Sequence, residues 1–182
     1  METKTYQIYK YNELTEEQQT TVLENYRDIN THEDWWEPIY EDISIPGYSN
    51  IDVNFSGFWS QGDGASLTAT IDLCAWLKSK QLANQYRALY NAAKKGDVNA
   101  EIIRNSSRYS HEHTISASVN AEADVYLYED VVENLLTEDA RNESRKIYKQ
   151  LEAYYNELTS DDAIVDTLLA NDYNFTAAGK ID

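Results

Sequence analysis

The chain has 182 residues, with 32 acidic against 15 basic side chains, and its formal net charge at pH 7 is −17. This charge disfavours direct binding to DNA or RNA, because neutralising phosphates requires a surplus of basic residues. A single cysteine, Cys74, excludes an intrachain disulfide, and the lack of a signal peptide or of an apolar run of ~20 residues predicts a soluble cytoplasmic protein.

The N-terminal part of the chain predicts a strand followed by a helix. Residues 4–11 are rich in side chains that favour strands. Thr15 and Gln18 have the spacing of a capping box, in which each side chain binds the backbone N–H of the other residue at the start of a helix. The side chains that recur at helical spacing after this start are Val22, Tyr26 and Ile29.

The next segment predicts a hairpin. A short acidic helix is expected over residues 32–44, and a Pro-Gly pair ends it with a turn. Apolar and polar residues then alternate over 51–55 and again over 66–73, which is typical of half-buried strands. The glycine-rich segment between these two strands is therefore expected to connect them as a β-hairpin.

The middle of the chain predicts two helices and a strand. Residues 75–95 carry an apolar helical stripe, and Gly96 follows two lysines as a C-terminal cap. A short helix is expected around residues 100–106. Residues 113–121 alternate strictly between apolar and polar side chains and predict a strand.

The C-terminal part is expected to be helix-rich from about 129 to 170. One long helix is predicted over residues 129–158, a second begins at a cap formed by Thr159 or Ser160, and residues 173–176 favour a last short strand. Strands joined by short loops, with helices grouped between and after them, predict a single α+β domain over residues 1–182. Its small antiparallel sheet would have about four strands packed with several helices.

The glycine-rich loop is the least ordinary stretch of the sequence. Glycine is favoured where the backbone needs a positive φ or where another group approaches closely, so we expect a specified structural turn. Its aspartate is expected to bind nearby backbone, although a metal ion or an anion bound at the turn is an alternative. The residues of this structural loop are Gly57, Gln61, Gly62, Asp63 and Gly64.

Two histidines raise the question of a metal site. His111 and His113 are two residues apart, so on a strand they would project from one face. With Asp63 they could complete a set of two histidines and one carboxylate. Hydrogen-bonded histidines at the edge of the core are favoured instead, and we expect neither a metal nor a cofactor. Because no serine or cysteine stands in a nucleophile context, we also expect no enzymatic activity.

Two adjacent tryptophans mark a candidate partner-binding surface. On a helix, neighbouring residues cannot both face inward, so one ring is expected at the surface or its boundary. The alternative places one ring in the core and the other on a neighbouring helix. Tryptophan among carboxylates is typical of protein-binding hot spots. The residues of this surface are Glu33, Asp34, Trp35, Trp36, Glu37, Glu41 and Asp42.

The charge is unevenly distributed along the chain. Residues 1–64 carry a net charge of −10, residues 65–120 carry +3, and residues 121–182 carry −10. Such acidic segments would attract a partner with a basic groove, such as a nucleic-acid enzyme. The C-terminal acids alternate with basic residues and are expected to form solvated helix faces with ion pairs one turn apart.

Residues 55–66, Phe-Ser-Gly-Phe-Trp-Ser-Gln-Gly-Asp-Gly-Ala-Ser, resemble a signature of small phage and prophage proteins. Residues 171–176 and 179–181 are similar to the end of the same proteins, so the resemblance runs from about residue 35 onward. Some members are associated with anti-defence loci, including anti-CRISPR candidates. The resemblance implies a phage-encoded inhibitor of a bacterial defence nuclease, with an anti-CRISPR protein favoured.

Three hypotheses for the function follow. The first is an acidic nucleic-acid mimic that occupies a basic groove of a host nuclease, with no membrane and no direct nucleic-acid binding. The second is a small ligand- or metal-binding protein, or an enzyme, whose pocket lies at the glycine loop and at His111 and His113. The third is a structural phage protein without a ligand.

Overall fold

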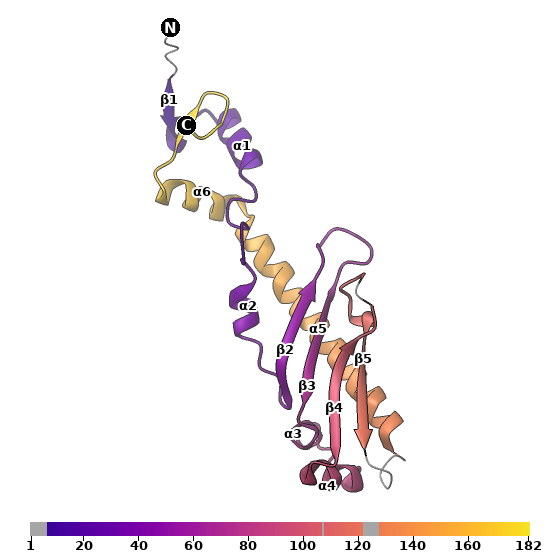
Figure 1. Cartoon of the computed structure of the whole chain (residues 1–182). Coiled ribbons are helices and arrows are strands. Elements are labelled where there is room, and N and C mark those ends of the chain that lie inside the picture. The colour runs from indigo at the N-terminus through magenta and orange to yellow at the C-terminus, as the bar shows by residue number, and fades with distance from the viewer. Residues whose placement is uncertain (1–6, 107, 122–127) are drawn as a thin grey trace, which may run out of the picture. The chain divides into compact units, whose positions relative to one another are not determined.

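The computed structural model describes residues 7–106, 108–121 and 128–182 (Figure 1). The chain divides into two compact units, which we call the terminal unit (residues 1–38 and 151–182) and the central unit (residues 39–150). The long helix α5 (Glu129–Leu158) contributes to both units. The single domain expected from the sequence stays a prediction, whereas the expected helix-rich segment corresponds to α5 and α6 (Asp161–Ala170).

The central unit is built on a four-stranded antiparallel sheet, which confirms the expected α+β class. Its strands are β2 (Tyr48–Phe55), β3 (Ala65–Ile71), β4 (Val98–Arg104) and β5 (Ile115–Ala121). They lie in the order β2-β3-β4-β5, and each pairs with its neighbour in antiparallel fashion. The hairpin expected between the two alternating segments is β2–β3, with Phe55 opposite Ala65 at its closed end.

The helix expected around residues 100–106 is wrong, because that segment is strand β4. Ala100 and Ile102 are buried, while the alternating positions Asn99, Glu101 and Ile103 are exposed. This burial has the two-residue period of a strand rather than the period of a helix. Ile102 lies opposite Ala69 of β3 and Ala117 of β5, so the strand is held on both sides.

The single helix expected over residues 75–95 is also wrong, because two helices occupy this region. They are α3 (Leu73–Ser79) and α4 (Arg87–Lys95). Asp72 begins α3 by accepting a hydrogen bond from the backbone N–H of Ala75, and Gln81 interrupts the segment with a positive φ of 60°. The predicted cap at Gly96 is confirmed, since this glycine ends α4 in the left-handed region.

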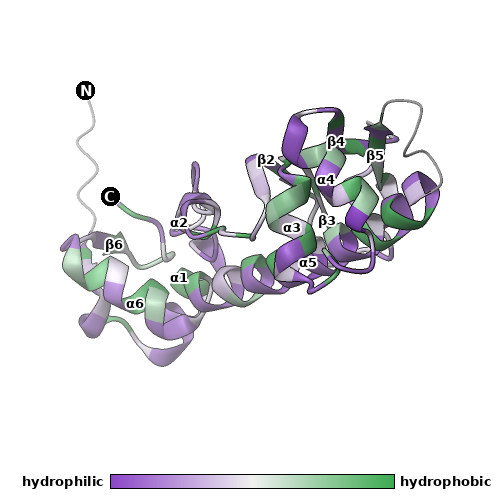
Figure 2. Cartoon of the chain, turned by 90° about the horizontal axis from the view of Figure 1, so that it is seen from below, coloured by the Kyte–Doolittle hydropathy of each residue, from purple (hydrophilic) through white to green (hydrophobic). Residues whose placement is uncertain are grey.

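Helix α5 runs beside the edge strand β5 and satisfies its outward-facing backbone. Its side chains Thr137, Glu133 and Glu129 accept hydrogen bonds from three β5 backbone N–H groups, at 2.7–2.8 Å. An open edge would be a template for pairing with another chain, so this helix protects the sheet. Figure 2 shows that α5 carries both hydrophobic and hydrophilic residues along its length.

The expectation of solvated acidic faces on α5 is therefore wrong for part of the helix. Glu138 and Glu143 do form ion pairs with Arg141 and Lys146, three residues further along. Glu133 and Glu129, by contrast, bind the backbone of β5. Glu129 and Glu133 have this role because α5 contacts β5, and the spacing of residues along the helix does not predict that contact.

Among the glycines of the central unit, Gly47 is the one where a side chain is least tolerated. Its φ is +87°, and an added Cβ would lie 2.7 Å from the backbone nitrogen of Trp76. Gly62, in the β2–β3 loop, lacks both constraints, since its φ is not positive and nothing lies within 4 Å of an added Cβ.

We expect Gly47→Ala to lower the free energy of unfolding by about 2 kcal/mol. The alanine would have to adopt a positive φ, and its Cβ would overlap the backbone of Trp76. Gly62→Ala is the matched control and is expected to change it by less than about 0.5 kcal/mol. Urea denaturation followed by circular dichroism measures both values. An equal decrease in the free energy of unfolding in the two variants would contradict the view that only Gly47 excludes a side chain.

The terminal unit combines a small sheet with two helices. Strands β1 (Ile8–Lys10) and β6 (Asn174–Thr176) pair in antiparallel fashion beside the short helix η1 (Tyr11–Glu13), α1 (Glu16–Asn25) and α6. The strand expected over 4–11 is thus β1, and its first three residues lie outside the described part. The predicted strand near 173–176 is β6. The core of this unit is formed by Tyr11, Leu14, Val22, Ile164, Leu168 and Phe175.

The start of α1 has the predicted capping box. The Thr15 backbone N–H donates to the Gln18 side chain at 3.0 Å, and the Gln18 N–H donates to the Thr15 hydroxyl at 3.4 Å. Ser160 caps α6, because its hydroxyl accepts a hydrogen bond from the backbone N–H of Ala163 at 3.2 Å. The acidic helix expected over 32–44 is much shorter, since α2 spans only Glu37–Glu41.

Candidate functional site

The two tryptophans of the expected partner-binding surface lie in an aromatic cluster of the terminal unit. Trp35 contacts Trp36 edge-on, with ring centroids 5.9 Å apart. The Trp35 ring also lies 6.2 Å from that of Tyr154 and 5.5 Å from that of Tyr155 on α5. Both tryptophans are partly exposed and precede α2, so they do not lie on a helix and neither ring is in the core.

Exposed carboxylates lie next to these tryptophans along the chain. Glu33, Asp34 and Glu37 are all exposed. Glu33 has a positive φ of 56°, which side chains rarely adopt and which costs of order 1 kcal/mol. The other two acids of the expected surface, Glu41 and Asp42, are also exposed but belong to the central unit.

The terminal unit carries most of the net negative charge of the chain. It holds 16 acidic and 4 basic residues, whereas the central unit holds 16 acidic and 11 basic residues. Among the described residues of this unit, Lys10 forms an ion pair with Asp172 and Arg27 forms one with Asp161. Excess carboxylate charge and a partly exposed aromatic cluster therefore occur in the same unit.

The glycine-rich loop joins β2 to β3, and its aspartate binds backbone as predicted. One carboxylate oxygen of Asp63 accepts hydrogen bonds from the N–H groups of Trp59 and Ser60, at 2.8 and 2.7 Å. Ser56 and Gly64 close the loop with a backbone hydrogen bond of 3.0 Å. These contacts fit the structural reading of the loop, because they commit the carboxylate to its own turn.

The expectation of positive φ angles at the loop glycines is wrong. Gly57, Gly62 and Gly64 do not have them. Only Gly64 shows the other reason for glycine, close approach, because an added Cβ there would lie 2.9 Å from the ring of His111. Gln61 is exposed at the tip of the loop.

The two histidines are not on a strand, so the predicted strand position is wrong. They belong to a short 3₁₀ turn, η2 (Glu112–Thr114), for which His111 is the N-terminal cap, and β5 begins only at Ile115. The His113 side chain is 67% exposed and therefore does not share the buried face of β5. The turn is held by Thr114, whose hydroxyl donates to the His111 carbonyl at 2.7 Å.

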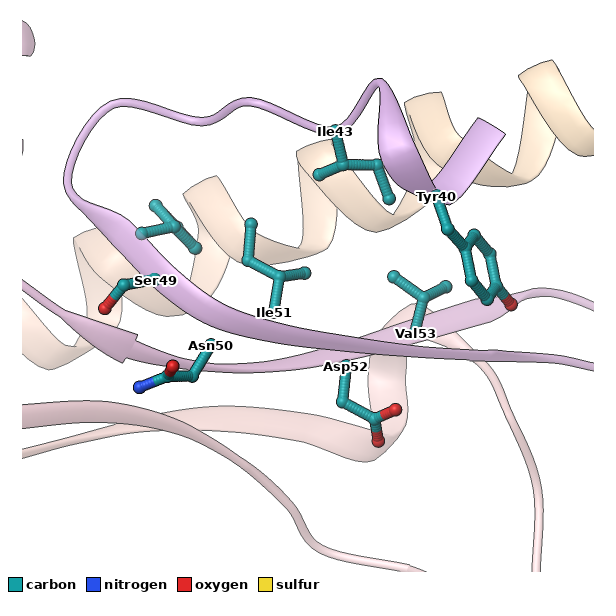
Figure 3. A pocket seen from close by; sticks show the side chains of 8 residues that line it. Tyr40, Ile43, Ser49, Asn50, Ile51, Asp52 and Val53 are labelled. Atoms are coloured by element: carbon teal, nitrogen blue, oxygen red, sulfur yellow. The ribbon is translucent and has the colours of Figure 1, made fainter. Parts of the chain in front are cut away.

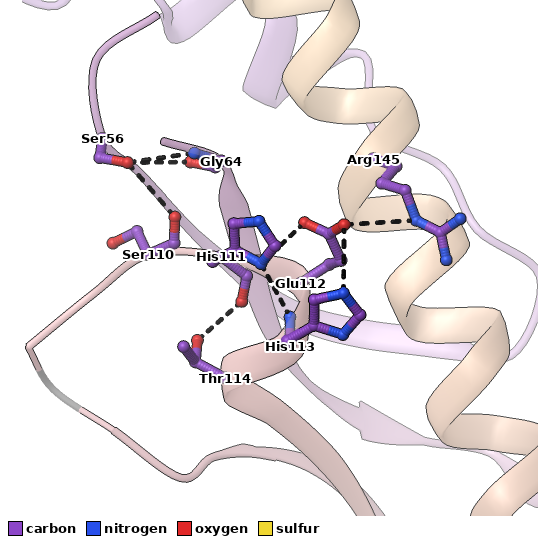
Figure 4. A network of polar contacts seen from close by, with 8 residues as sticks. All are labelled: Ser56, Gly64, Ser110, His111, Glu112, His113, Thr114 and Arg145. Atoms are coloured by element: carbon purple, nitrogen blue, oxygen red, sulfur yellow. Dashed lines mark hydrogen bonds and ion pairs between the residues drawn. The ribbon is translucent and has the colours of Figure 1, made fainter. Parts of the chain in front are cut away.

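Glu112 brings the two imidazoles together (Figure 4). One of its carboxylate oxygens lies 3.1 Å from His111 Nδ1, and the other lies 3.9 Å from His113 Nε2. The two rings stack with centroids 5.1 Å apart, and Arg145 Nε of α5 lies 3.6 Å from Glu112. One possible ligand atom from each of His111, Glu112 and His113 lies within 4.8 Å of the others.

The carboxylate beside the histidines is thus Glu112, not the Asp63 that sequence reasoning considered. Asp63 is held within its own loop, although His111 packs against that loop at Gly64. The consecutive His-Glu-His run was the available signal. It was missed because a strand would have placed Glu112 on the opposite face from both histidines.

A cavity of about 340 Å³ is lined by Tyr40, Ile43 and residues 48–53 of β2 (Figure 3). Ile51 and Val53 point toward Tyr40 and Ile43, while Asn50 and Asp52 point the other way. Burial, together with the negative charge of Asp52, raises the pKa of Tyr40 to about 12. A neutral phenol among aliphatic side chains offers a hydrogen bond but no reactive pair of groups.

Among the described residues, no helix is long and apolar enough to cross a membrane. No curated protein and no solved structure matches the chain significantly. A family described as a domain of unknown function, DUF8835, matches residues 35–161. This segment is more than two thirds of the chain and includes the tryptophans, the glycine-rich loop and the histidine cluster. The chain therefore belongs to the DUF8835 family.

Proposed function

We propose that this protein is a phage-encoded inhibitor that occupies a basic groove of a bacterial defence nuclease in the cytoplasm of the infected cell. A CRISPR effector is the favoured partner. The observation that carries the proposal is the coincidence, in the terminal unit, of a large excess of carboxylates with a partly exposed tryptophan pair.

Charge and aromatic contact have different roles in such a complex. The carboxylates near Trp35 would steer the protein toward a basic surface and fix its register. Charge alone acts weakly at physiological salt, where the Debye length is about 8 Å. The tryptophan rings would supply the short-range energy of a hot spot once they are covered by the partner.

The nature of the partner is supported by two points. A groove that binds nucleic acid neutralises phosphates with lysine and arginine side chains, and an acidic protein fits it by the same electrostatics as a phosphate backbone. The resemblance of residues 55–66 to phage proteins found near anti-defence genes favours a defence nuclease over other nucleic-acid enzymes.

The proposal is tested by inhibition and by its dependence on salt. We expect the purified protein to inhibit target cleavage by a CRISPR effector and to bind that effector directly. The affinity is expected to fall at least about tenfold between 50 and 500 mM NaCl, because the added salt screens the carboxylates. Binding measured by biolayer interferometry over this range, and unchanged by salt, would contradict groove occupation.

A second candidate function, ligand or metal binding at the histidine cluster, is favoured by one observation. His111, Glu112 and His113 present their donor atoms to one another at a partly exposed turn. This candidate differs from the first in requiring no protein partner.

A further inference from the structure

We propose that His111, Glu112 and His113 form a binding site for a divalent transition-metal ion, with Zn²⁺ as the favoured ion. A tetrahedral ion with ligands at about 2.0–2.2 Å holds its ligand atoms roughly 3.3–3.5 Å apart. His111 Nδ1 and Glu112 are already 3.1 Å apart. One ligand atom from each of His111, Glu112 and His113 lies within 4.8 Å of the others, and the exposed side chain of His113 is able to close the remaining gap.

His111 Nδ1 is the candidate ligand atom of this residue. It accepts a hydrogen bond from the backbone N–H of His113, with 3.2 Å between the two nitrogens. It also lies 3.1 Å from a carboxylate oxygen of Glu112. An ion bound at Nδ1 would take the lone pair that now accepts the His113 N–H and would be shared with this carboxylate oxygen, because unprotonated imidazole and carboxylate are both metal ligands.

The surroundings hold the candidate ligands in place. The His111 ring packs against Gly64, where any Cβ would overlap it, and its carbonyl accepts hydrogen bonds from both the backbone and the hydroxyl of Thr114. Glu112 is only 15% exposed, and Arg145 lies near one of its two carboxylate oxygens. Arg145 thereby orients Glu112 and leaves the oxygen nearest His111 for the ion. Such outer contacts are what position the ligands in metal sites.

The donor set determines which ions fit. Two imidazole nitrogens and one carboxylate oxygen suit Zn²⁺, Co²⁺ and Ni²⁺, whereas Mg²⁺ and Ca²⁺ prefer oxygen ligands only. Three protein ligands leave at least one coordination position for water or for a partner's side chain. The positive charge of Arg145 reduces the affinity, so a site weaker than a four-ligand structural zinc site is expected.

The test is calorimetric titration of the full-length protein, first stripped of metal with a chelator, with ZnCl₂ and in parallel with MgCl₂. We expect one equivalent of Zn²⁺ to bind and Mg²⁺ not to bind. His113→Ala is expected to weaken Zn²⁺ binding at least about tenfold, because it removes a ligand from a three-ligand site. The exposure of His113 makes this variant suitable, since its removal leaves the core unchanged.

Two further variants serve as matched controls. His32→Ala removes the third histidine of the chain, which is exposed in the terminal unit, and is expected to leave Zn²⁺ binding unchanged. Asp63→Asn is expected to leave it unchanged as well. Co²⁺ absorption in the visible range reports whether the coordination is tetrahedral. Equal Zn²⁺ affinity in wild type and His113→Ala, or binding of Mg²⁺ as tight as that of Zn²⁺, would overturn the proposal.

Discussion

Replacing Asp139 by alanine is expected to lower the free energy of unfolding by about 3 kcal/mol, although this residue looks like one of many helix-surface acids. Its carboxylate accepts hydrogen bonds from Trp76 Nε1 at 2.8 Å and from the Tyr48 hydroxyl at 3.2 Å. It also forms an ion pair with Lys80 at 2.5 Å. Trp76 is 1% exposed. Removing the Asp139 carboxylate therefore leaves the buried indole N–H of Trp76 without this acceptor.

The neighbouring Glu138 provides the matched control for this prediction. Its side chain is 59% exposed and is paired with Arg141. Glu138→Ala is therefore expected to change the free energy of unfolding by less than about 1 kcal/mol. Asp139→Asn keeps an oxygen acceptor for the indole and should lose less than Asp139→Ala. Urea denaturation followed by tryptophan fluorescence measures all three, and equal losses at the two adjacent positions would show that the contacts of Asp139 are not stabilising.

The contact between Tyr48 and Asp139 also affects the pKa of the Tyr48 phenol. Burial, first, and the charge of Asp139, second, raise the pKa of its phenol well above the usual value near 10. The folded protein therefore keeps this phenol neutral at a pH where the unfolded chain ionises it. Stability from this group is fully present below pH ~10 and is lost as the pH rises above that value.

Sequence patterns predicted the elements whose cause is local. The capping box at Thr15, the cap at Gly96 and the alternation on either side of the glycine-rich loop depend on residues within a few positions of each other. The break at Gln81 was missed because residues 75–95 contain neither glycine nor proline, the usual signals of a helix end. Strand β4 was missed because its alternating pattern is short and one of its outward positions is Ile103.

Residues whose role depends on distant partners could not be predicted in this way. Asp139 contacts Trp76 across 63 positions, and Glu133 binds β5 only because α5 runs beside that edge. Sequence position also could not show that the histidines lie on a turn, where Glu112 joins them on one side. The tryptophan pair was recognisable from composition alone, but its contacts with Tyr154 were not.

The strongest test of the proposed function is charge reversal beside the tryptophans. We expect Glu33→Lys combined with Glu37→Lys to weaken binding to the inhibited nuclease at least about tenfold, or about 1.4 kcal/mol. The two exposed side chains flank Trp35 and Trp36 in the sequence, so the change puts positive charge where a basic groove would approach. Lysine at position 33 adopts the positive φ no less readily than glutamate, and folding should be unaffected.

A control with the same change in charge separates local contact from overall charge. Asp97→Lys combined with Glu101→Lys alters two exposed acids of the central unit and also changes the net charge by +4. If the overall net charge of the protein drove association with the nuclease, both double variants would lose affinity equally. If the terminal unit makes the contact, only the first loses affinity at physiological salt, and its residual binding becomes less sensitive to salt, since rim charges act through steering. Equal or reversed effects at unchanged melting temperature would place the contact surface elsewhere on the molecule.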